Sequence, residues 1–424
     1  MSSQQEPLSA STKYRILRDA DLRDYLAQVP EVAVQLGEAC ESWSVSEVGD
    51  GNLNLVFIVR GARRGIAVKQ ALPYVRLVGE SWPLPLSRSH YEYRALVHQA
   101  KLAPGLVPAV LHHDEALAVT AMELLEPHII MRKGLIAGTC YPHFVDHITT
   151  FLARTLFFSS DLANAAAQKK DGIAAFTGNH ALCKITEDLI FTDPYREAEQ
   201  NHWTSPWLDN AAAAIRQDMD LHIAISRLKL KFMTRPEALI HGDLHTGSIM
   251  VTDGETRVID PEFAFYGPMG FDVGAIIGNF LLAYVCQRGH ERVRSERDGN
   301  RAYLLEQIVD LWTTFARGFA GLWREHAQGD LYSSRILAGS PDLLEQAIAI
   351  RLQSIWERSV GFAGCKMIRR ILGLAHVEDF ESISDFDLRG KCEDSAVRLA
   401  RDMLVNRHAY LNVEALVRSA REYA

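Results

Sequence analysis

The sequence has few cysteines and no long apolar run, and each shortage excludes a class of protein. Its six cysteines are scattered at positions 40, 140, 183, 286, 365 and 392, without a C-x-x-C pair. This spacing argues against a zinc ribbon or a disulfide framework and fits a reducing compartment. The longest apolar stretch, residues 273–286, has 14 residues, fewer than the roughly 20 that a membrane span needs. We expect it to form a buried core helix of a cytoplasmic protein.

The sequence also lacks a long basic cluster and an apolar leader. It carries 45 Lys and Arg against 53 Asp and Glu, a net charge of −8, and its basic clusters are pairs such as Arg63-Arg64 and Lys169-Lys170. This balance argues against partners such as nucleic acid or an anionic membrane. A small phosphate-bearing ligand is still allowed, because it needs only a few local cations and a metal. Residues 1–13 are polar, which predicts no secretory signal.

The first third of the chain alternates turn residues with β-favouring runs. Apolar residues make up 48% and charged residues 23% of the 424 positions, a typical globular composition with room for about two or three domains. We expect residues 1–20 to be flexible and residues 21–40 to be helical. Runs rich in Val, Ile and Phe then predict strands at residues 43–48 and 53–60, which form a hairpin, and at 66–70, 107–111 and 116–125. Residues 87–99 are predicted to form a helix between these strands.

Helical periodicity dominates from residue 129 onward. It is interrupted by a strand-like island at 238–251 and 256–259, and the predicted helices span residues 144–162, 208–231, 303–328, 343–372 and 395–424. We therefore predict an α+β fold of two lobes, a β-rich lobe of residues 1–125 and a helical lobe of residues 126–424, joined by a hinge at about 122–126. Such an arrangement is suited to holding a ligand between lobes.

The densest polar motif, HGDLHTGSI at residues 241–249, lies inside the island. Asp260-Pro261-Glu262 follows 17 residues after Asp243, and the spacing predicts a two-stranded ribbon that brings these carboxylates to one end. In extended backbone Asp260 and Glu262 point to the same side, which favours a Mg²⁺ site completed by phosphate oxygens. Asp243 is then available to accept a proton or hydrogen bond from an attacking hydroxyl. This division of roles suits phosphoryl transfer.

His241-Gly242-Asp243, the Asp-x-Glu pair and the upstream Lys69 resemble the kinase-like phosphotransferases, which include aminoglycoside and choline kinases. Four blocks in order also resemble the 5-methylthioribose kinases within that superfamily: GDGNLNLVF (49–57), HGDLHTGSI (241–249), DPEFAFYGPMGFD (260–272) and GFAGCKMIRRILGLAH (361–376). The resemblance runs from about residue 20 to the C-terminus. It implies a bilobal protein-kinase-like fold, ATP and Mg²⁺ as cofactors, and a homodimer. The implied reaction is phosphorylation of the anomeric hydroxyl of 5-methylthioribose to the 1-phosphate, in methionine salvage.

The resemblance also implies a role for each matching residue. Asp243 matches the catalytic aspartate that activates the sugar hydroxyl, and Asp260 and Glu262 match the metal pair. Arg369 and Arg370 match twin arginines that hold the sugar hydroxyls. The implied contacts to the nucleotide are Lys69 on the phosphates, a glycine-rich turn, a hinge that reads adenine, and the metal-binding segment: Gly49, Gly51, Asn52, Lys69, Glu123, Leu124, Leu125, Asp260, Pro261 and Glu262. One departure is Ser248, which stands where the superfamily commonly has a metal-binding Asn, and Glu262 can replace that ligand.

Several of these residues also have simpler interpretations. Asp243 and Asp260 are residue types common in turns, and Lys69 is either a solvated lysine or the partner of Glu92. We expect His241 to stabilise its loop, and Asp272 to cap the helix that follows instead of taking part in the chemistry. The superfamily resemblance implies that Asp272 also braces the catalytic loop, which is compatible with capping. Trp203 and Trp207 either cover the methylthio group or pack against the protein.

Two other functions remain open from the residues. The first is a related small-molecule kinase acting on an aminoglycoside, choline, ethanolamine or homoserine, whose cationic substrate calls for acidic and aromatic residues. The second is a non-catalytic nucleotide-binding or scaffold protein, which requires a lost catalytic residue. Lys69, Asp243, Asp260 and Glu262 are all present, which argues against the second.

Overall fold

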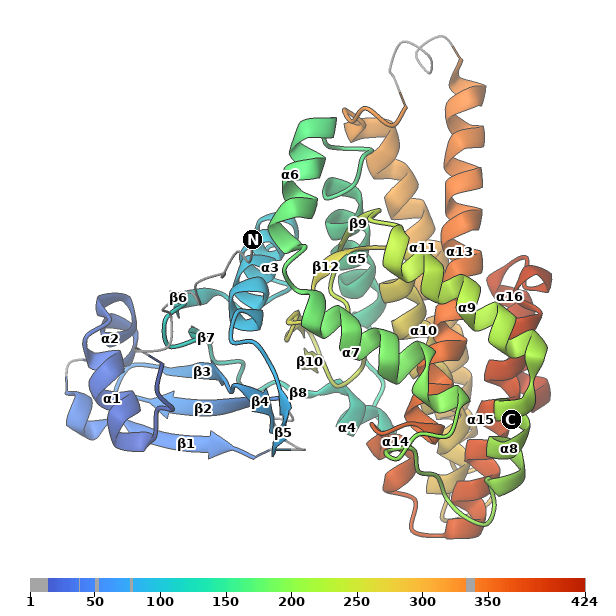
Figure 1. The fold of residues 1–424 in the computed structure, drawn as a ribbon, viewed down its shortest axis with the longest axis horizontal. Coiled ribbons are helices and arrows are strands. Elements are labelled where there is room, and N and C mark those ends of the chain that lie inside the picture. Colours follow the sequence, from blue (N-terminus) through green and yellow to red (C-terminus); the bar gives the residue numbers. More distant parts are fainter. Residues whose placement is uncertain (1–13, 38, 50–52, 77–78, 333–339, 424) are drawn as a thin grey trace, which may run out of the picture. The chain divides into compact units, whose positions relative to one another are not determined.

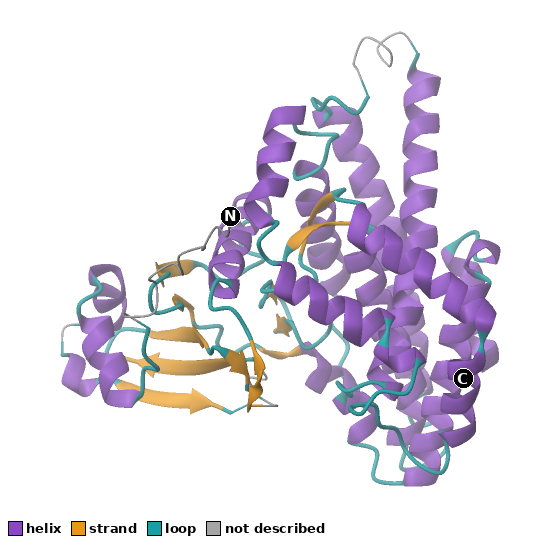
Figure 2. Ribbon diagram, viewed as in Figure 1, coloured by secondary structure: helices purple, strands orange, loops and turns teal. Residues whose placement is uncertain are grey.

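The computed structural model describes residues 14–37, 39–49, 53–76, 79–332 and 340–423. The chain divides into an N-terminal unit, Met1–Lys101 with Val107–Glu126, and a C-terminal unit, Leu102–Leu106 with Pro127–Ala424. In these residues the first unit contains a β-sheet together with three α-helices, and the second unit is mainly helical (Figure 1, Figure 2). The predicted α+β fold, with a β-rich first part and a mainly helical second part, is confirmed.

A five-stranded antiparallel sheet in the order β1-β2-β3-β7-β6 forms the centre of the N-terminal unit. Alternate side chains such as Phe57 and Val59, or Ile66 and Val68, are buried, as the two-residue period of a strand requires. The predicted hairpin is confirmed, with Val48 opposite Val56. The strands are β1 Ser44–Val48, β2 Asn54–Arg60, β3 Gly65–Ala71, β6 Val110–Asp114 and β7 Val119–Glu123, while β4 Tyr74–Val75 and β5 Gly79–Pro83 form a separate pair.

The predicted helix over residues 21–40 is wrong, because the segment forms two short helices. Pro30 causes the break, since proline cannot continue a helix but suits its first position. Leu22 and Leu26 are buried in one cluster with Phe57 and Val68 of the sheet. The helices of this unit are α1 Asp19–Ala27, α2 Pro30–Leu36, the 3₁₀ turn η1 Cys40–Ser42 and α3 Arg88–Leu102.

Residues 14–18 belong to the segment predicted to be flexible, yet they are bound to the sheet. The Leu17 N–H donates to Gln70 Oε1 at 2.9 Å, and Gln70 Nε2 donates to the Arg15 carbonyl at 2.8 Å. The Leu17 side chain is fully buried. Residues 1–13 lie outside the described part of the chain.

The C-terminal unit is a helical assembly that confirms most of the predicted helices. The long predicted helices 208–231 and 395–424 are wrong as single elements. Asp218 starts a new helix by accepting the Leu221 N–H at 3.0 Å, which is the geometry of an N-cap. The helices are α4 Met131–Ala137, α5 Phe144–Phe158, α6 Ala166–Phe176, α7 His180–Phe191, α8 Asp209–Gln217, α9 Met219–Thr234, α10 Gly270–Cys286, α11 Asp298–His326, α13 Pro341–Leu372, α14 Glu378–Glu381, α15 Phe386–Val405 and α16 Val413–Tyr423.

Helix α10 is the core of this unit, and every one of its residues is buried. The helical segment Gly270–His290 is long and apolar enough to cross a membrane by length and composition, but its apolar window of 18 residues is entirely buried inside the protein, so the predicted core helix is confirmed. Two glycines allow α10 and α13 to approach closely. A Cβ on Gly274 would lie 2.4 Å from the Ser359 carbonyl oxygen, and one on Gly278 would lie 2.9 Å from that of Ala363. This packing brings the C-terminal half of α13 beside the start of α10.

The strand island contains two short sheets instead of one ribbon. The expected ribbon is present as β10 paired with β11, but β9 pairs with β12. The loop of residues 241–248 connects β9 to β10, and the segment 259–264 connects β11 to β12. The strands are β8 Ile129–Ile130, β9 Ala238–Ile240, β10 Ile249–Val251, β11 Thr256–Val258 and β12 Phe265–Gly267.

Candidate active site

The loop that carries Asp243 begins with a glycine for steric reasons. Gly242 has a φ of +86°, which favours glycine, and a Cβ there would lie 2.2 Å from the Phe263 carbonyl oxygen. The preceding His241 accepts the Asp243 N–H at Nδ1 (3.3 Å), so its Nε2 donates to the Ile259 carbonyl at 2.9 Å. The loop-stabilising role expected of His241 is confirmed.

Asp272 braces the same loop from helix α10. Its carboxylate accepts the backbone N–H of His241 at 2.6 Å and of Gly242 at 3.1 Å. Burial raises the pKa of this carboxyl group, against the lowering effect of His241 and the two N–H donors. Met269 occupies the N-cap of α10, so the capping role is wrong and the bracing role is confirmed. Both roles, capping and bracing, suit an aspartate near the start of a helix, so the sequence alone does not show which role Asp272 has.

Ser248 closes the loop onto itself. Its hydroxyl accepts the His245 N–H at 2.9 Å and has the carbonyls of Asp243 and His245 within 2.9 Å as acceptors. The residue is 3% exposed. The hydroxyl group is therefore engaged in holding the loop that presents Asp243.

Asp243 is an ionised carboxylate whose two oxygens have different surroundings. Lys366 Nζ lies 2.7 Å from Oδ1, and His245 Nε2 lies 3.4 Å from Oδ2. Burial alone raises the pKa of Asp243, but the charge of Lys366, the interaction with His245 and the charge of Arg369 outweigh it and hold the pKa well below its usual range. His245 accepts the Gly247 N–H at Nδ1 (2.9 Å), so a neutral His245 carries its proton on Nε2 and turns it toward Asp243.

Three cations of helix α13, at positions 366, 369 and 370, interact electrostatically with the Asp243 carboxylate. Positions three and four apart lie on one face of a helix, so Lys366 shares a face with both arginines. Arg369 is 8% exposed, and its Nε and Nη1 have no hydrogen-bond partner among the described residues. Arg370 donates to the Ala375 carbonyl at 3.4 Å. Burial lowers the pKa of both guanidinium groups, which still stay charged because arginine is not deprotonated in proteins.

Sequence reasoning assigned no role to Lys366. A lysine inside the apolar run GFAGCKMI was the available signal, because a buried charge requires a partner. Sequence reasoning also missed Arg132 on α4, which connects the catalytic loop to Asp379. The backbone N–H of Arg132 donates to the Thr246 carbonyl at 3.1 Å, and its side-chain Nε lies 3.1 Å from Asp379 Oδ2.

The carboxylate groups of Asp260 and Glu262 lie close together, but the backbone between them is not extended. Asp260 has a φ of +66°, and Glu262 lies in a turn that is closed by the Ala264 N–H on the Pro261 carbonyl at 3.1 Å. The expected extended geometry is therefore wrong. The two side chains nevertheless have carboxylate oxygens within 4.8 Å of one another. Asn179, just before α7, holds the turn by donating to the carbonyls of Glu262 and Ala264 at 2.8 and 2.9 Å.

In the N-terminal unit, Lys69 has the partner that the sequence left open. Its Nζ lies 2.9 Å from Glu92 Oε1, and the Glu92 side chain is 4% exposed. Lys69 lies on β3 opposite Val56 and Thr120. At the end of β7, the Glu123 N–H donates to the Ala109 carbonyl at 2.8 Å, and Leu124 and Leu125 follow. Gly49 is a turn residue directly after β1. Gly51 and Asn52 lie outside the described residues.

The two tryptophans pack against helices of the C-terminal unit. Trp203 Nε1 donates to Asp209 Oδ1 at 2.7 Å, and its ring lies 5.4 Å from the Arg216 guanidinium carbon. Trp207 Nε1 donates to Asp387 Oδ1 at 3.1 Å, and its ring stacks on Phe386. Both tryptophans therefore pack against the protein, which is the second of the two interpretations that the sequence left open.

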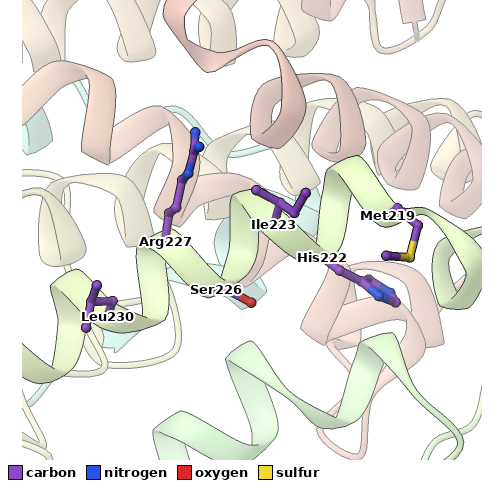
Figure 3. A pocket seen from close by; sticks show the side chains of 6 residues that line it. All are labelled: Met219, His222, Ile223, Ser226, Arg227 and Leu230. Carbon is purple, nitrogen blue, oxygen red and sulfur yellow. The ribbon is translucent and has the colours of Figure 1, made fainter.

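A surface hollow lies away from all of these residues. Figure 3 shows it on helix α9, with a volume of about 350 Å³ and a lining of Met219, His222, Ile223, Ser226, Arg227 and Leu230. Three of its six side chains are apolar, and none belongs to the loops that carry Asp243 or Glu262. This hollow therefore contains none of the residues that the sequence motifs single out.

Comparison with known proteins gives one family model and relatives that match nearly the whole chain. The model of the phosphotransferase enzyme family matches residues 44–308. Methylthioribose kinase 1 of Oryza sativa subsp. japonica is 45% identical over 95% of this chain and 94% of its own length. Methylthioribose kinase of Escherichia coli is 46% identical over 97% and 99%. A choline kinase structure from Cryptosporidium parvum Iowa II covers 92% of this chain and 97% of its own at 12% identity, with a TM-score of 0.46.

A β-rich unit with a lysine–glutamate pair, followed by a helical unit with an HGD loop and an Asp-x-Glu turn, defines a kinase-like phosphotransferase. The similarity to the curated relatives extends through both units, including the helices after residue 308 that the family model does not reach. The chain belongs to the methylthioribose kinase family.

Proposed function

We propose that this protein is an ATP-dependent kinase that phosphorylates the anomeric hydroxyl of 5-methylthioribose, giving 5-methylthioribose 1-phosphate and ADP. The substrate is supported by relatives named methylthioribose kinase at 45% and 46% identity over nearly the whole chain. The observation that carries the chemistry is the Asp243 carboxylate, ionised, 18% exposed and held at one oxygen. A homodimer is proposed from the family resemblance alone, and a cytoplasmic location from the scattered cysteines, which fit a reducing compartment.

Asp243 orients the hydroxyl and receives its proton in the proposed reaction. The hydroxyl oxygen forms a bond to the γ-phosphorus, while the bond from that phosphorus to the bridging oxygen breaks and ADP leaves with the electron pair. Because its pKa lies well below the usual range, Asp243 is a weak base. We therefore place proton transfer late, when the forming bond to phosphorus has made the hydroxyl acidic.

Arg369 and Arg370 are proposed to bind the sugar. Among the described residues, Nε and Nη1 of Arg369 have no hydrogen-bond partner and are buried. A buried donor without a partner is costly, so hydroxyl oxygens of a sugar would satisfy them. Both arginines interact electrostatically with Asp243 and with the nearby Arg132, which makes the site rich in guanidinium groups. Such a site repels a cationic aminoglycoside or choline, so the alternative kinases are not favoured.

Asp260 and Glu262 fit a Mg²⁺ ion, because they offer two hard carboxylate oxygens within 4.8 Å and phosphate oxygens and water can complete the coordination. We propose that these two residues hold the ion and that Pro261 sets the chain between them. When bound, Mg²⁺ neutralises phosphate charge. Ser248 is not included, since its hydroxyl group is engaged by the loop.

The N-terminal unit contributes its own residues to the proposal. Lys69, oriented by Glu92 at 2.9 Å, is assigned to the nucleotide phosphates. The backbone of Glu123, Leu124 and Leu125 is assigned to adenine. The glycine-rich turn, with Gly49, Gly51 and Asn52, completes the set proposed for the nucleotide.

The test is ADP release by purified enzyme with ATP and Mg²⁺ over a panel of acceptors. The panel contains methylthioribose, ribose, choline, homoserine and kanamycin. We expect methylthioribose to give the highest kcat/KM, and phosphorus NMR of the product to show a phosphate on the anomeric oxygen. A higher kcat/KM with any other acceptor would contradict the proposed substrate.

A further inference from the structure

We propose that Lys366 is a positioning residue: its ammonium group holds Oδ1 of Asp243, so that Oδ2 alone is presented to the sugar hydroxyl. The inference rests on the proposed function and adds a residue for which the sequence motifs gave no role. Lys366 acts here through Asp243 and does not itself contact the substrate.

The contact between the two side chains is short and buried. Lys366 Nζ lies 2.7 Å from Asp243 Oδ1, and the Lys366 side chain is 2% exposed against 18% for Asp243. Asp243 is the only hydrogen-bond acceptor of this ammonium group among the described residues, and its other neighbour is the Phe271 ring at 4.7 Å. A charge-assisted hydrogen bond of this length fixes the orientation of a carboxylate. Lys366 therefore reaches Asp243 from the protein interior.

The second oxygen of Asp243 remains available. His245 Nε2 lies 3.4 Å from Oδ2, longer than an ordinary hydrogen bond to a carboxylate. The other nitrogen of His245 is engaged by the Gly247 N–H, which keeps the ring from turning. With Oδ1 engaged and Oδ2 only weakly contacted, the loop presents one defined oxygen for the proton of the substrate.

The charge of Lys366 is expected to set an alkaline limit on turnover. Burial lowers the pKa of Lys366 to about 8, against the opposing effect of Asp243. Below that pH the ammonium group pairs with the carboxylate, and above it the pair is lost. The charged and titratable groups facing Lys366 come from the catalytic loop, α10 and α13: Asp243, His245, Asp272, Cys365, Arg369 and Arg370. Of these, His245 titrates at about 3 and Cys365 at about 12.

The experiment combines Lys366→Met, Lys366→Arg, Asp243→Asn and the double variant Lys366→Met/Asp243→Asn. A lost ion pair lets the carboxylate rotate, and a misplaced catalytic group costs about 100-fold in kcat, so we expect that loss in Lys366→Met with an unchanged KM for ATP. Lys366→Arg keeps the positive charge at all pH values. It should recover part of kcat and move the alkaline limb to higher pH.

The double variant separates positioning from a merely structural role. If Lys366 acts through Asp243, its removal should cost little in the Asp243→Asn background, because residues that act as a unit are not additive. An equal fold-loss from Lys366→Met in both backgrounds would overturn the inference, and so would an alkaline limb that stays in place in Lys366→Arg. The matched control is Lys169→Met, another buried lysine whose pKa is lowered to about 8, which should leave kcat and the pH profile unchanged.

The outcomes also separate this inference from the proposed function. If the wild-type enzyme does not phosphorylate methylthioribose, the proposed function is wrong. If it does, but Lys366→Met retains the wild-type kcat, the proposed function stands and the positioning role of Lys366 is wrong. Should Lys366→Met fail to fold, Lys366→Arg and its pH profile still decide.

Discussion

Two buried lysines of the C-terminal unit show how the same residue type serves structure in one region and chemistry in another. Lys169 on α6 and Lys366 on α13 are 3% and 2% exposed, and burial lowers the pKa of each to about 8. The Lys169 ammonium group donates to the carbonyls of Ser159 and Glu237 at 3.1 and 2.6 Å, and Asp161 lies 3.5 Å away. Among the described residues, the Lys366 ammonium group has Asp243 as its one hydrogen-bond acceptor.

The difference lies in how completely the surrounding polar groups are satisfied. Around Lys169, three acceptors match the three N–H donors of an ammonium group, so this ammonium group is fully engaged by the protein. Around Lys366, Arg369 keeps two buried N–H groups without partners among the described residues. Burial and a shifted pKa are thus shared by both regions, whereas a carboxylate with only one oxygen engaged at short distance distinguishes the region that we propose to act on a substrate.

The largest expected effect on kcat comes from removing the carboxylate of Asp243, the partner of Lys366. Asp243→Asn keeps the shape of the side chain but cannot accept the proton, and loss of a general base lowers kcat by about 1,000-fold. The measurement is methylthioribose-dependent ADP release. Asp253→Asn, in the exposed turn between β10 and β11, is the control and should retain full activity. Activity of Asp243→Asn within about tenfold of wild type would remove Asp243 from the mechanism.

The next effect concerns the carboxylate pair near the same loop. Glu262→Gln removes one of two charged ligands, so we expect a Mg²⁺ titration of activity to shift to at least about tenfold higher metal concentration. Glu255→Gln alters an exposed glutamate in the neighbouring turn and should leave the titration in place. An unchanged Mg²⁺ midpoint in Glu262→Gln would exclude Glu262 from the metal site.

A smaller effect, on stability alone, is expected in the Lys169 region. Lys169→Met leaves the carbonyls of Ser159 and Glu237 without their donor, and an unsatisfied buried group costs about 1–3 kcal/mol. Urea unfolding should show this loss while kcat stays at the wild-type value. A large fall in kcat in the folded variant would break the distinction between the two lysines.

The smallest effect is the pH dependence of that stability. Lys169 has a pKa of about 8 in the folded protein and 10.5 as its ordinary value, so between these values the unfolded chain binds more protons. The contribution of such a group to stability rises with pH through this window. We expect the stability of wild type relative to Lys169→Met to increase from about pH 8 toward pH 10. A constant difference in urea unfolding free energy would show that Lys169 is not titrating as inferred.

Local sequence patterns predicted the elements whose residues interact with near neighbours. The hairpin of residues 43–60 and the core helix at 273–286 were found because alternation, turn residues and apolar runs act within a few residues. Element ends depend on caps and breaks such as Pro30 and Asp218. Those two residues divided segments that periodicity alone had joined.

The candidate site was predicted as a set of residues but not as a geometry. Asp243 and Glu262 stand in recognisable motifs, and the partner of Lys69 was anticipated. The left-handed backbone of Asp260 was not, because it depends on the turn that Asn179 holds from a distant part of the chain. Gly51 and Asn52 remain a prediction, since they lie outside the described residues.

The sequence by itself determined the class of chemistry, because the HGD loop, the Asp-x-Glu pair and the arginine pair are short motifs. Their residues are close together along the chain, so they can be recognised without the structure. Only the tertiary structure decided which charges meet. Lys366 lies 123 residues from Asp243 along the chain, and the two are brought together because the glycines of α10 let α13 pack closely against it. A long-range ion pair of this kind is a property of packing, which no local pattern contains.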